Sequence, residues 1–184
     1  GMFCTQCEAE GFRRITYYPD RPDVMAPFDV TIHSDLPYAL SNGESLGSAG
    51  QTRRWRDPWP KPAYLFALVA GEFQVVSDNF TTASGKPVDL NIYVRDGDQD
   101  KCAFALEALK ASMAWDERVY GREYDLSVFN IVAVDDFNMG AMENKGLNIF
   151  NSSAVLASPE TTVDGNFERI EAIIAHEYFH NWTG

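Results

Sequence analysis

The sequence is poor in cysteine and has no long hydrophobic run. Cys4, Cys7 and Cys102 form an odd set without the spacing of a disulfide scaffold, which indicates a reducing compartment. Cys4 and Cys7 have no second C-x-x-C pair and no thioredoxin-like context, so redox or metal use of this pair is not favoured. No apolar run approaches the roughly 20 residues of a membrane span, and no signal peptide opens the chain. We therefore expect a cytoplasmic protein without a membrane partner.

Positive charge is also scarce. The chain has 15 Lys and Arg against 27 Asp and Glu, a formal net charge of −12. A nucleic-acid partner needs a basic face that neutralises phosphates, and none is visible here. The balance mildly favours cationic ligands, although a solvated acidic surface explains most of the charge.

The first part of the chain has the pattern of β-structure. Residues 28–33 alternate apolar and polar side chains, as a strand with one buried face does, and residues 41–43 mark a turn. Three prolines exclude residues 57–62 from a helix interior or a central strand. The apolar run 63–70 is short enough to be a strand buried on both faces. The 184 residues can hold one sizeable core or two small ones, and we expect a domain boundary just after this run.

From residue 73 the pattern changes to a hairpin followed by helices and strands. Cys102, Leu106, Leu109 and Met113 recur at the spacing of a helix with one apolar stripe, and Gly121 marks its end. The other expected elements are hairpin strands at 73–76 and 88–94, a buried strand at 128–134, one or two strands at 140–150, and a last helix after a polar loop at 158–165.

Polar residues near the two helices suggest how each begins and ends. We expect Asp98 or Asp100 to cap the first helix, and Asp164 or Asn166 to cap the second. Gly184 sits where the second helix would end.

The last helix carries the sequence H-E-x-x-H at His176, Glu177 and His180. Residues four apart lie on one helix face, so two neutral imidazoles can bind one zinc ion. Zinc lowers the pKa of a bound water to about 7, and Glu177 would take its proton and pass it to the leaving amine. The motif is that of a zinc hydrolase.

The alternative is that the two histidines are simply packed or capped on the helix. The local pattern argues against this alternative, because a separate apolar stripe already supplies the core face of the helix. That stripe consists of Phe167, Ile170, Ile174 and Tyr178, with Ile173 beside it.

A second motif, Gly140-Ala141-Met142-Glu143-Asn144, separates the kinds of zinc hydrolase. Together with the H-E-x-x-H helix, this G-A-M-E-N segment resembles the M1 family of zinc aminopeptidases, and the resemblance covers essentially the whole chain. The resemblance implies one Zn²⁺ per site and an α+β fold. Residues 1–72 would be the end of a β-rich N-terminal domain, and residues 73–184 the front part of a thermolysin-like domain. Further matching segments are 6–14, 136–139, 145–151 and 176–184.

The resemblance also implies how the free N-terminus of a peptide substrate is recognised. Glu143, helped by Glu8, would bind the α-ammonium, because a fixed carboxylate is a direct partner for that charge. Gln6 and Met139 match positions that line the pocket for the first side chain. If these residues have no role in binding, Glu143 is a surface carboxylate in a glycine-bounded turn and Glu8 is a solvated strand residue.

The rest of the G-A-M-E-N segment belongs to the same substrate-binding set. The strand that carries Gly140 and Ala141 can offer backbone groups to the substrate chain. By the same resemblance, Met142 and Asn144 are also expected to bind the substrate.

Two histidines are fewer than the three protein ligands of a catalytic zinc. By resemblance, the third ligand is a glutamate and the oxyanion-stabilising residue a tyrosine, both beyond Gly184. We therefore expect a piece of a longer, monomeric aminopeptidase that alone binds zinc weakly, has little activity and can self-associate. The alternatives are an epoxide hydrolase of the same family and a non-catalytic peptide-binding fragment.

Overall fold

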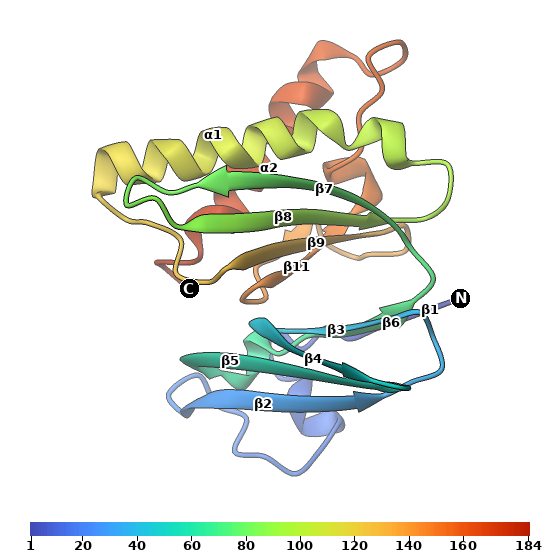
Figure 1. The fold of residues 1–184 in the computed structure, drawn as a ribbon, viewed down its shortest axis with the longest axis vertical. Helices are drawn as coiled ribbons and strands as arrows, with labels where there is room; N and C mark the ends of the chain where they lie inside the picture. The colour runs from blue at the N-terminus through green and yellow to red at the C-terminus, as the bar shows by residue number, and fades with distance from the viewer. The chain divides into compact units, whose positions relative to one another are not determined.

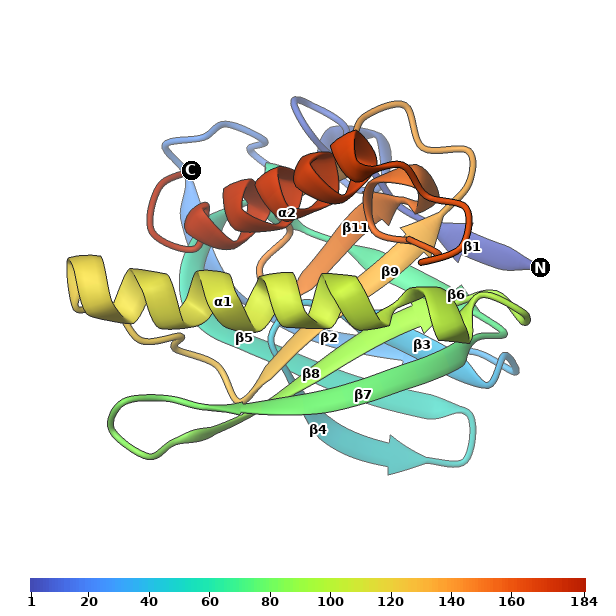
Figure 2. The ribbon, with the colours of Figure 1, turned by 90° about the horizontal axis from the view of Figure 1, so that it is seen from above.

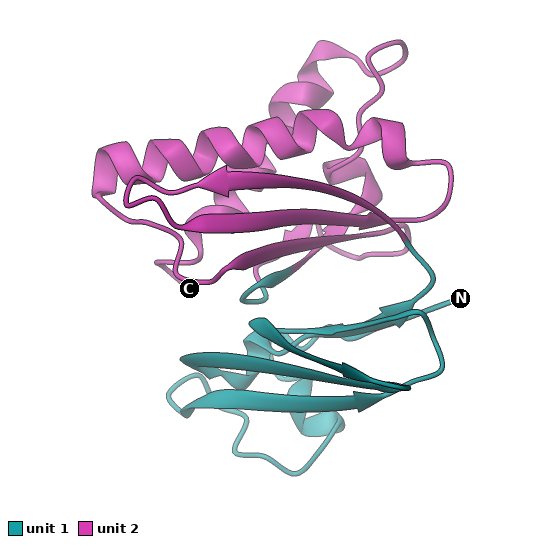
Figure 3. Cartoon of the chain, viewed as in Figure 1, with its two compact units in different colours: residues 1–73, 144–147 teal, residues 74–143, 148–184 magenta.

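The computed structural model describes residues 1–184, which divide into two compact units (Figure 3). Unit 1 contains residues 1–73 and 144–147, and unit 2 contains residues 74–143 and 148–184. The predicted α+β class, with a β-rich first part and a helix-containing second part, is confirmed.

Unit 1 consists of two three-stranded antiparallel sheets, ordered β1-β6-β3 and β2-β5-β4. Buried Cys7, Phe12, Ala63 and Phe66 form an apolar cluster within it. Its strands are β1 (Met2–Cys4), β2 (Met25–His33), β3 (Tyr38–Ser41), β4 (Glu44–Ala49), β5 (Thr52–Pro62) and β6 (Leu68–Gly71), with 3-10 turns η1 (Phe12–Arg14) and η2 (Ala63–Leu65).

The strand predicted over 28–33 is confirmed, since it lies within β2 and its apolar side chains are the less exposed ones. The exclusion of residues 57–62 from a helix interior or a central strand is confirmed, because they form the end of β5, where this strand pairs with β2 alone. The prolines are tolerated for two reasons. β4 pairs only with residues 52–56 of β5, and the β2 register shifts between Ala26 and Phe28, opposite the prolines.

The single strand expected over 63–70 was wrong. Residues 63–65 form η2, and only Leu68–Gly71 forms β6. The Asn42 side chain explains the break, because its amide donates to the Leu65 carbonyl at 2.9 Å and its oxygen accepts from the Ala67 N–H at 2.8 Å. These bonds occupy backbone groups that a continuous strand would pair with a neighbour.

Unit 2 is a five-stranded mixed sheet, ordered β10-β11-β9-β8-β7, with two helices on one face (Figures 1 and 2). The β8 and β9 strands are parallel, and helix α1 forms the connection between them. The elements are β7 (Gln74–Thr81), β8 (Pro87–Val94), η3 (Gln99–Lys101), α1 (Ala103–Tyr120), β9 (Val128–Val134), β10 (Ala141–Met142), β11 (Leu147–Asn151), η4 (Ser152–Ala154) and α2 (Asp164–Phe179).

The apolar stripes predicted for both helices are confirmed in the core of unit 2. The stripe of α1 packs in the same cluster as Ile170, Ile174 and Tyr178 of α2, and each of these three α2 residues is at most 1% exposed. Phe167 and Ile173 are partly buried against this cluster. Neither helix is both long enough and apolar enough to cross a membrane.

The helix caps were predicted less well. Gly121 ends α1 with a φ of 62°, as expected, but neither helix has a side-chain cap at its start. Asp98 accepts instead from Arg95 and Lys101. Helix α2 ends at Phe179 and not near Gly184, because the chain then continues in tight turns.

Candidate metal and amine-binding site

Helix α2 brings the two histidines of the H-E-x-x-H motif together at its end. His176 lies in the last turn of α2, and His180 is its C-cap residue. Their Nε2 atoms are 3.0 Å apart and their ring planes are nearly perpendicular, at 87°. Two nitrogens bound to one zinc at ~2.0–2.1 Å in tetrahedral geometry would be separated by about 3.3 Å. The pair therefore has a spacing close to that of two zinc ligands.

The other ring nitrogen of His180 fixes which nitrogen is available. Nδ1 of His180 lies 2.7 Å from the backbone carbonyl oxygen of Thr183. A carbonyl can only accept, so Nδ1 carries the proton and neutral His180 presents a lone pair at Nε2. Ligating histidines commonly make this kind of bond through their second nitrogen.

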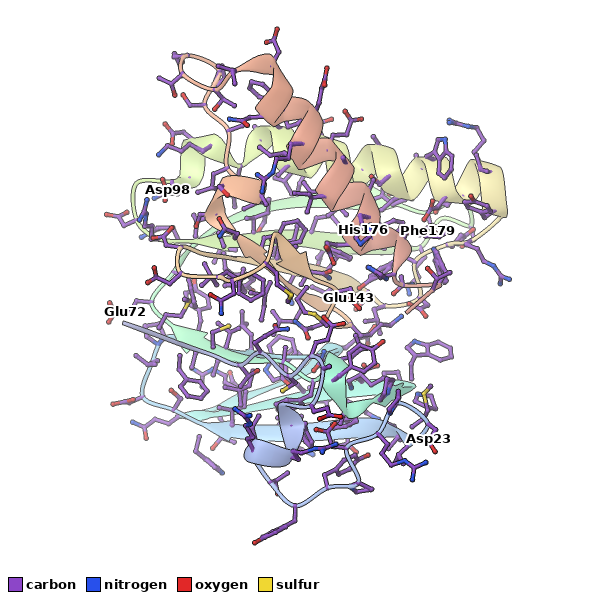
Figure 4. All side chains as sticks on the ribbon, turned by 180° about the vertical axis from the view of Figure 1, so that it is seen from behind. Asp23, Glu72, Asp98, Glu143, His176 and Phe179 are labelled. Atoms are coloured by element: carbon purple, nitrogen blue, oxygen red, sulfur yellow. The ribbon has the colours of Figure 1, made fainter.

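Two carboxylates lie beside His180. Ligand atoms of Glu143, Glu177 and His180 all lie within 4.8 Å of one another. Glu177 is on α2 and is only 7% exposed, whereas Glu143 directly follows β10 and is half-buried. Figure 4 shows Glu143 on its strand segment and His176 on the helix. The structure thus brings together four residues of the two predicted motifs.

Packing between β10 and α2 explains this convergence. Ala141 and Ile173 pack against the same apolar cluster. Gly140 also lies close to α2, since a Cβ added at Gly140 would lie 3.5 Å from the Cδ1 atom of Ile173. Packing of α2 against β10 therefore places the segment that leads into Glu143 beside the helix that carries the histidines.

Strand β10 is an edge strand of the unit 2 sheet. It pairs with β11 alone, through Ala141 with Phe150 and Met142 with Ile149. The Met142 side chain is fully buried and that of Asn144 is nearly so, whereas Met139 is 38% exposed. Met142 can therefore offer only its backbone to a ligand, while the Met139 side chain is accessible.

Gln6 and Glu8 belong to unit 1 and are both exposed. Glu8 lies in a turn after β1, so the alternative that it is a solvated strand residue was wrong. Both residues line a pocket of about 470 Å³ within unit 1, together with Thr5, Ala9, Glu10, Gly11, Arg14 and Ile15.

The contact of the Thr183 carbonyl with His180 could not be predicted from the sequence. Every residue carries a backbone carbonyl, so no residue type marks this contact. The polar side chains of Asn181 and Trp182 are the signal that could have pointed to this turn. They donate to Asp125 and Asp116 of unit 2.

Known protein families match both parts of the chain. The peptidase M1 N-terminal domain matches residues 1–65, and the peptidase family M1 domain matches residues 104–184. The chain belongs to peptidase family M1. The second match includes both the G-A-M-E-N and the H-E-x-x-H segments of this M1 chain.

Curated relatives include aminopeptidase N of Caulobacter vibrioides, 59% identical over 100% of this M1 chain, and aminopeptidase N of Escherichia coli K12, 57% identical over 98%. The crystal structure of Legionella pneumophila aminopeptidase A in complex with aspartic acid matches with a TM-score of 0.91 and 40% identity over 100% of the chain. The chain spans 22% of the length of each of these three proteins.

Proposed function

We propose that this M1 chain is part of a zinc-dependent aminopeptidase that releases N-terminal amino acids from peptides. The observation that carries the proposal is the carboxylate of Glu143 beside the ligand atoms of Glu177 and His180. A hydrolytic centre next to a fixed anion suits a substrate whose scissile bond lies one residue from a free ammonium group. The names of the bacterial relatives support the same activity.

His176 and His180 are the proposed zinc ligands in this chain. Their 3.0 Å Nε2 separation and the Nδ1 bond of His180 to a carbonyl support this role. Zinc, when bound, supplies the Lewis acidity that makes water a nucleophile near neutral pH. The third protein ligand, a glutamate beyond Gly184, remains a prediction.

Glu177 is proposed as the general base. Its carboxylate is held on α2 directly after a ligand histidine, and its low exposure limits competition from bulk water. A carboxylate in this position can accept a proton from the attacking water and deliver it to the departing amine.

Glu143 is proposed to hold the substrate ammonium, with Glu8 of unit 1 as a second carboxylate. The free edge of β10 supports a role for the backbone of Gly140 and Ala141, because an extended peptide can pair with such an edge. The exposure of Met139 and Gln6 is compatible with contact to the first side chain of a substrate.

The proposal extends to domain organisation and location. Residues 1–72 would end a β-rich N-terminal domain, and residues 73–184 would begin a thermolysin-like domain. The three cysteines are free, which supports a reducing compartment such as the cytoplasm. We expect a monomeric whole protein that needs no nucleic-acid or membrane partner.

The test is zinc-dependent hydrolysis of an alanyl anilide by the whole natural protein. We expect a chelator to abolish the activity and added zinc to restore it. A chelator-insensitive rate, or turnover of a lipid epoxide without peptide turnover, would contradict the proposed function.

A further inference from the structure

The turn after α2 holds the second histidine from outside the helix. The N–H groups of Asn181 and Trp182 donate to the carbonyls of Tyr178 and Phe179, both at 3.0 Å. These two bonds curl the chain back, so that the Thr183 carbonyl reaches Nδ1 of His180 at 2.7 Å. The position of this turn therefore determines which group lies beside Nδ1 of His180.

Two side chains of the turn are anchored elsewhere in unit 2. The indole N–H of Trp182 donates to Oδ2 of Asp116 at 3.3 Å, and the amide of Asn181 donates to Oδ1 of Asp125 at 3.2 Å. Asp116 lies on α1 and is only 3% exposed. A buried carboxylate is costly without a donor, so the indole bond favours one position of the turn.

We propose that Trp182 and Asn181 are positioning residues for the zinc site, acting through the Thr183 carbonyl on His180. The anchored turn holds the carbonyl in place, the carbonyl keeps the proton on Nδ1, and Nε2 is left free to bind the metal. The inference rests on the proposed function, in which His180 is a zinc ligand. It assigns a role in that site to two residues that do not touch the metal.

Trp182→Phe is the main test variant, because it removes the indole N–H and keeps an aromatic ring. Trp115→Phe is the matched control, since Trp115 lies next to Asp116 on α1 but is 45% exposed. Asp116→Asn retains a side-chain oxygen that can accept from Trp182, whereas Asp116→Leu does not. Asp116→Asn should therefore behave like the unmodified chain. Circular dichroism melting would establish whether each variant is folded. If Asp116→Leu does not fold, the conclusion rests on Trp182→Phe.

The first readout shows which ring nitrogen of His180 carries the proton in the zinc-free chain. It is measured from the ¹⁵N chemical shifts of the ring. We expect the proton on Nδ1 in the unmodified chain and in Trp115→Phe, and a larger share on Nε2 in Trp182→Phe. Loss of packing alone would lower the melting temperature without moving this proton. The first readout does not depend on zinc, so it tests the anchored turn even if the proposed function fails.

The second readout is the Zn²⁺ dissociation constant of the whole natural protein, from competition with a chromogenic chelator. Partners of ligating histidines commonly change metal affinity 10- to 100-fold, so we expect about 10-fold weaker binding for Trp182→Phe. Unchanged protonation and unchanged zinc affinity in Trp182→Phe would overturn the inference. If His180→Ala leaves the zinc affinity of the whole natural protein unchanged, the result would instead contradict the proposed function.

Discussion

The Nε2 atoms of His176 and His180 face each other at 3.0 Å. Two basic nitrogens so close together share either a proton or a cation. In the whole natural protein, replacing either residue with alanine should therefore abolish tight zinc binding, which titration calorimetry with Zn²⁺ would measure. His33→Ala is the matched control, because the third histidine of the chain is exposed on β2 of unit 1. Equal zinc binding by His176→Ala and His33→Ala would contradict the assignment.

Glu177→Gln should abolish turnover and leave zinc bound. The amide has nearly the shape of the carboxylate but does not accept a proton, so we expect kcat of the whole protein to fall by at least about 100-fold. Steady-state kinetics on a peptide, with metal analysis of the same sample, separates the two effects. A variant that retains most of its kcat would exclude Glu177 as the general base.

Glu143→Ala should mainly weaken recognition of the free amine. Removing a carboxylate that pairs with the substrate ammonium should raise KM several-fold or more for peptides with a free N-terminus. Glu168→Ala is a suitable control, because Glu168 is an exposed carboxylate on the same unit, in α2. If KM changes equally in both variants, or in neither, Glu143 is not the amine site.

Ile174→Ala should destabilise the helix that carries the histidines. Ile174 is 1% exposed within the core of unit 2, so a cavity there should reduce the free energy of unfolding by about 2–5 kcal/mol. Ile15→Ala removes the same atoms from a side chain that is 54% exposed and should change stability little. Urea unfolding followed by circular dichroism compares the two.

A buried ion pair in unit 1 makes a further prediction. Nζ of Lys61 lies 3.0 Å from Asp57, and both side chains are at most 4% exposed. Asp57→Asn should reduce the free energy of unfolding by about 3–5 kcal/mol, because it leaves a buried charge unpaired. Replacing Asp57 with Leu and Lys61 with Met together should recover most of that loss. A double variant no more stable than Asp57→Asn would contradict this account.

The same lysine should make stability depend on pH. Burial lowers the pKa of Lys61 from 10.5, despite the opposing effect of Asp57. Between the lowered pKa and 10.5 the unfolded chain binds the proton and the folded chain does not, so stability should rise with pH there. The rise should be absent in Lys61→Met, which urea unfolding at several pH values would measure.

The sequence predicted those parts of the fold that follow from periodicity. The stripe of Ile170, Ile174 and Tyr178, the strand at 128–134 and the end of α1 at Gly121 all depend on local spacing, and all are confirmed. The end of α2 was missed because it depends on turns formed after Phe179.

The error in unit 1 has the same physical origin. The side-chain bonds of Asn42 to Leu65 and Ala67 join residues more than 20 positions apart. Their effect on the strand expected over residues 63–70 is not visible in a local window of sequence. In the candidate site, residue types and spacing predict His176 and His180 as ligands, whereas the Thr183 carbonyl carries no such signal.

The most direct test of the account is the position of zinc, from anomalous diffraction at the zinc edge on crystals of the whole natural protein. We expect one ion about 2.0–2.1 Å from Nε2 of both His176 and His180, with Nδ1 of His180 still bonded to the Thr183 carbonyl. Zinc bound elsewhere, with the two histidine rings turned away from each other, would contradict it.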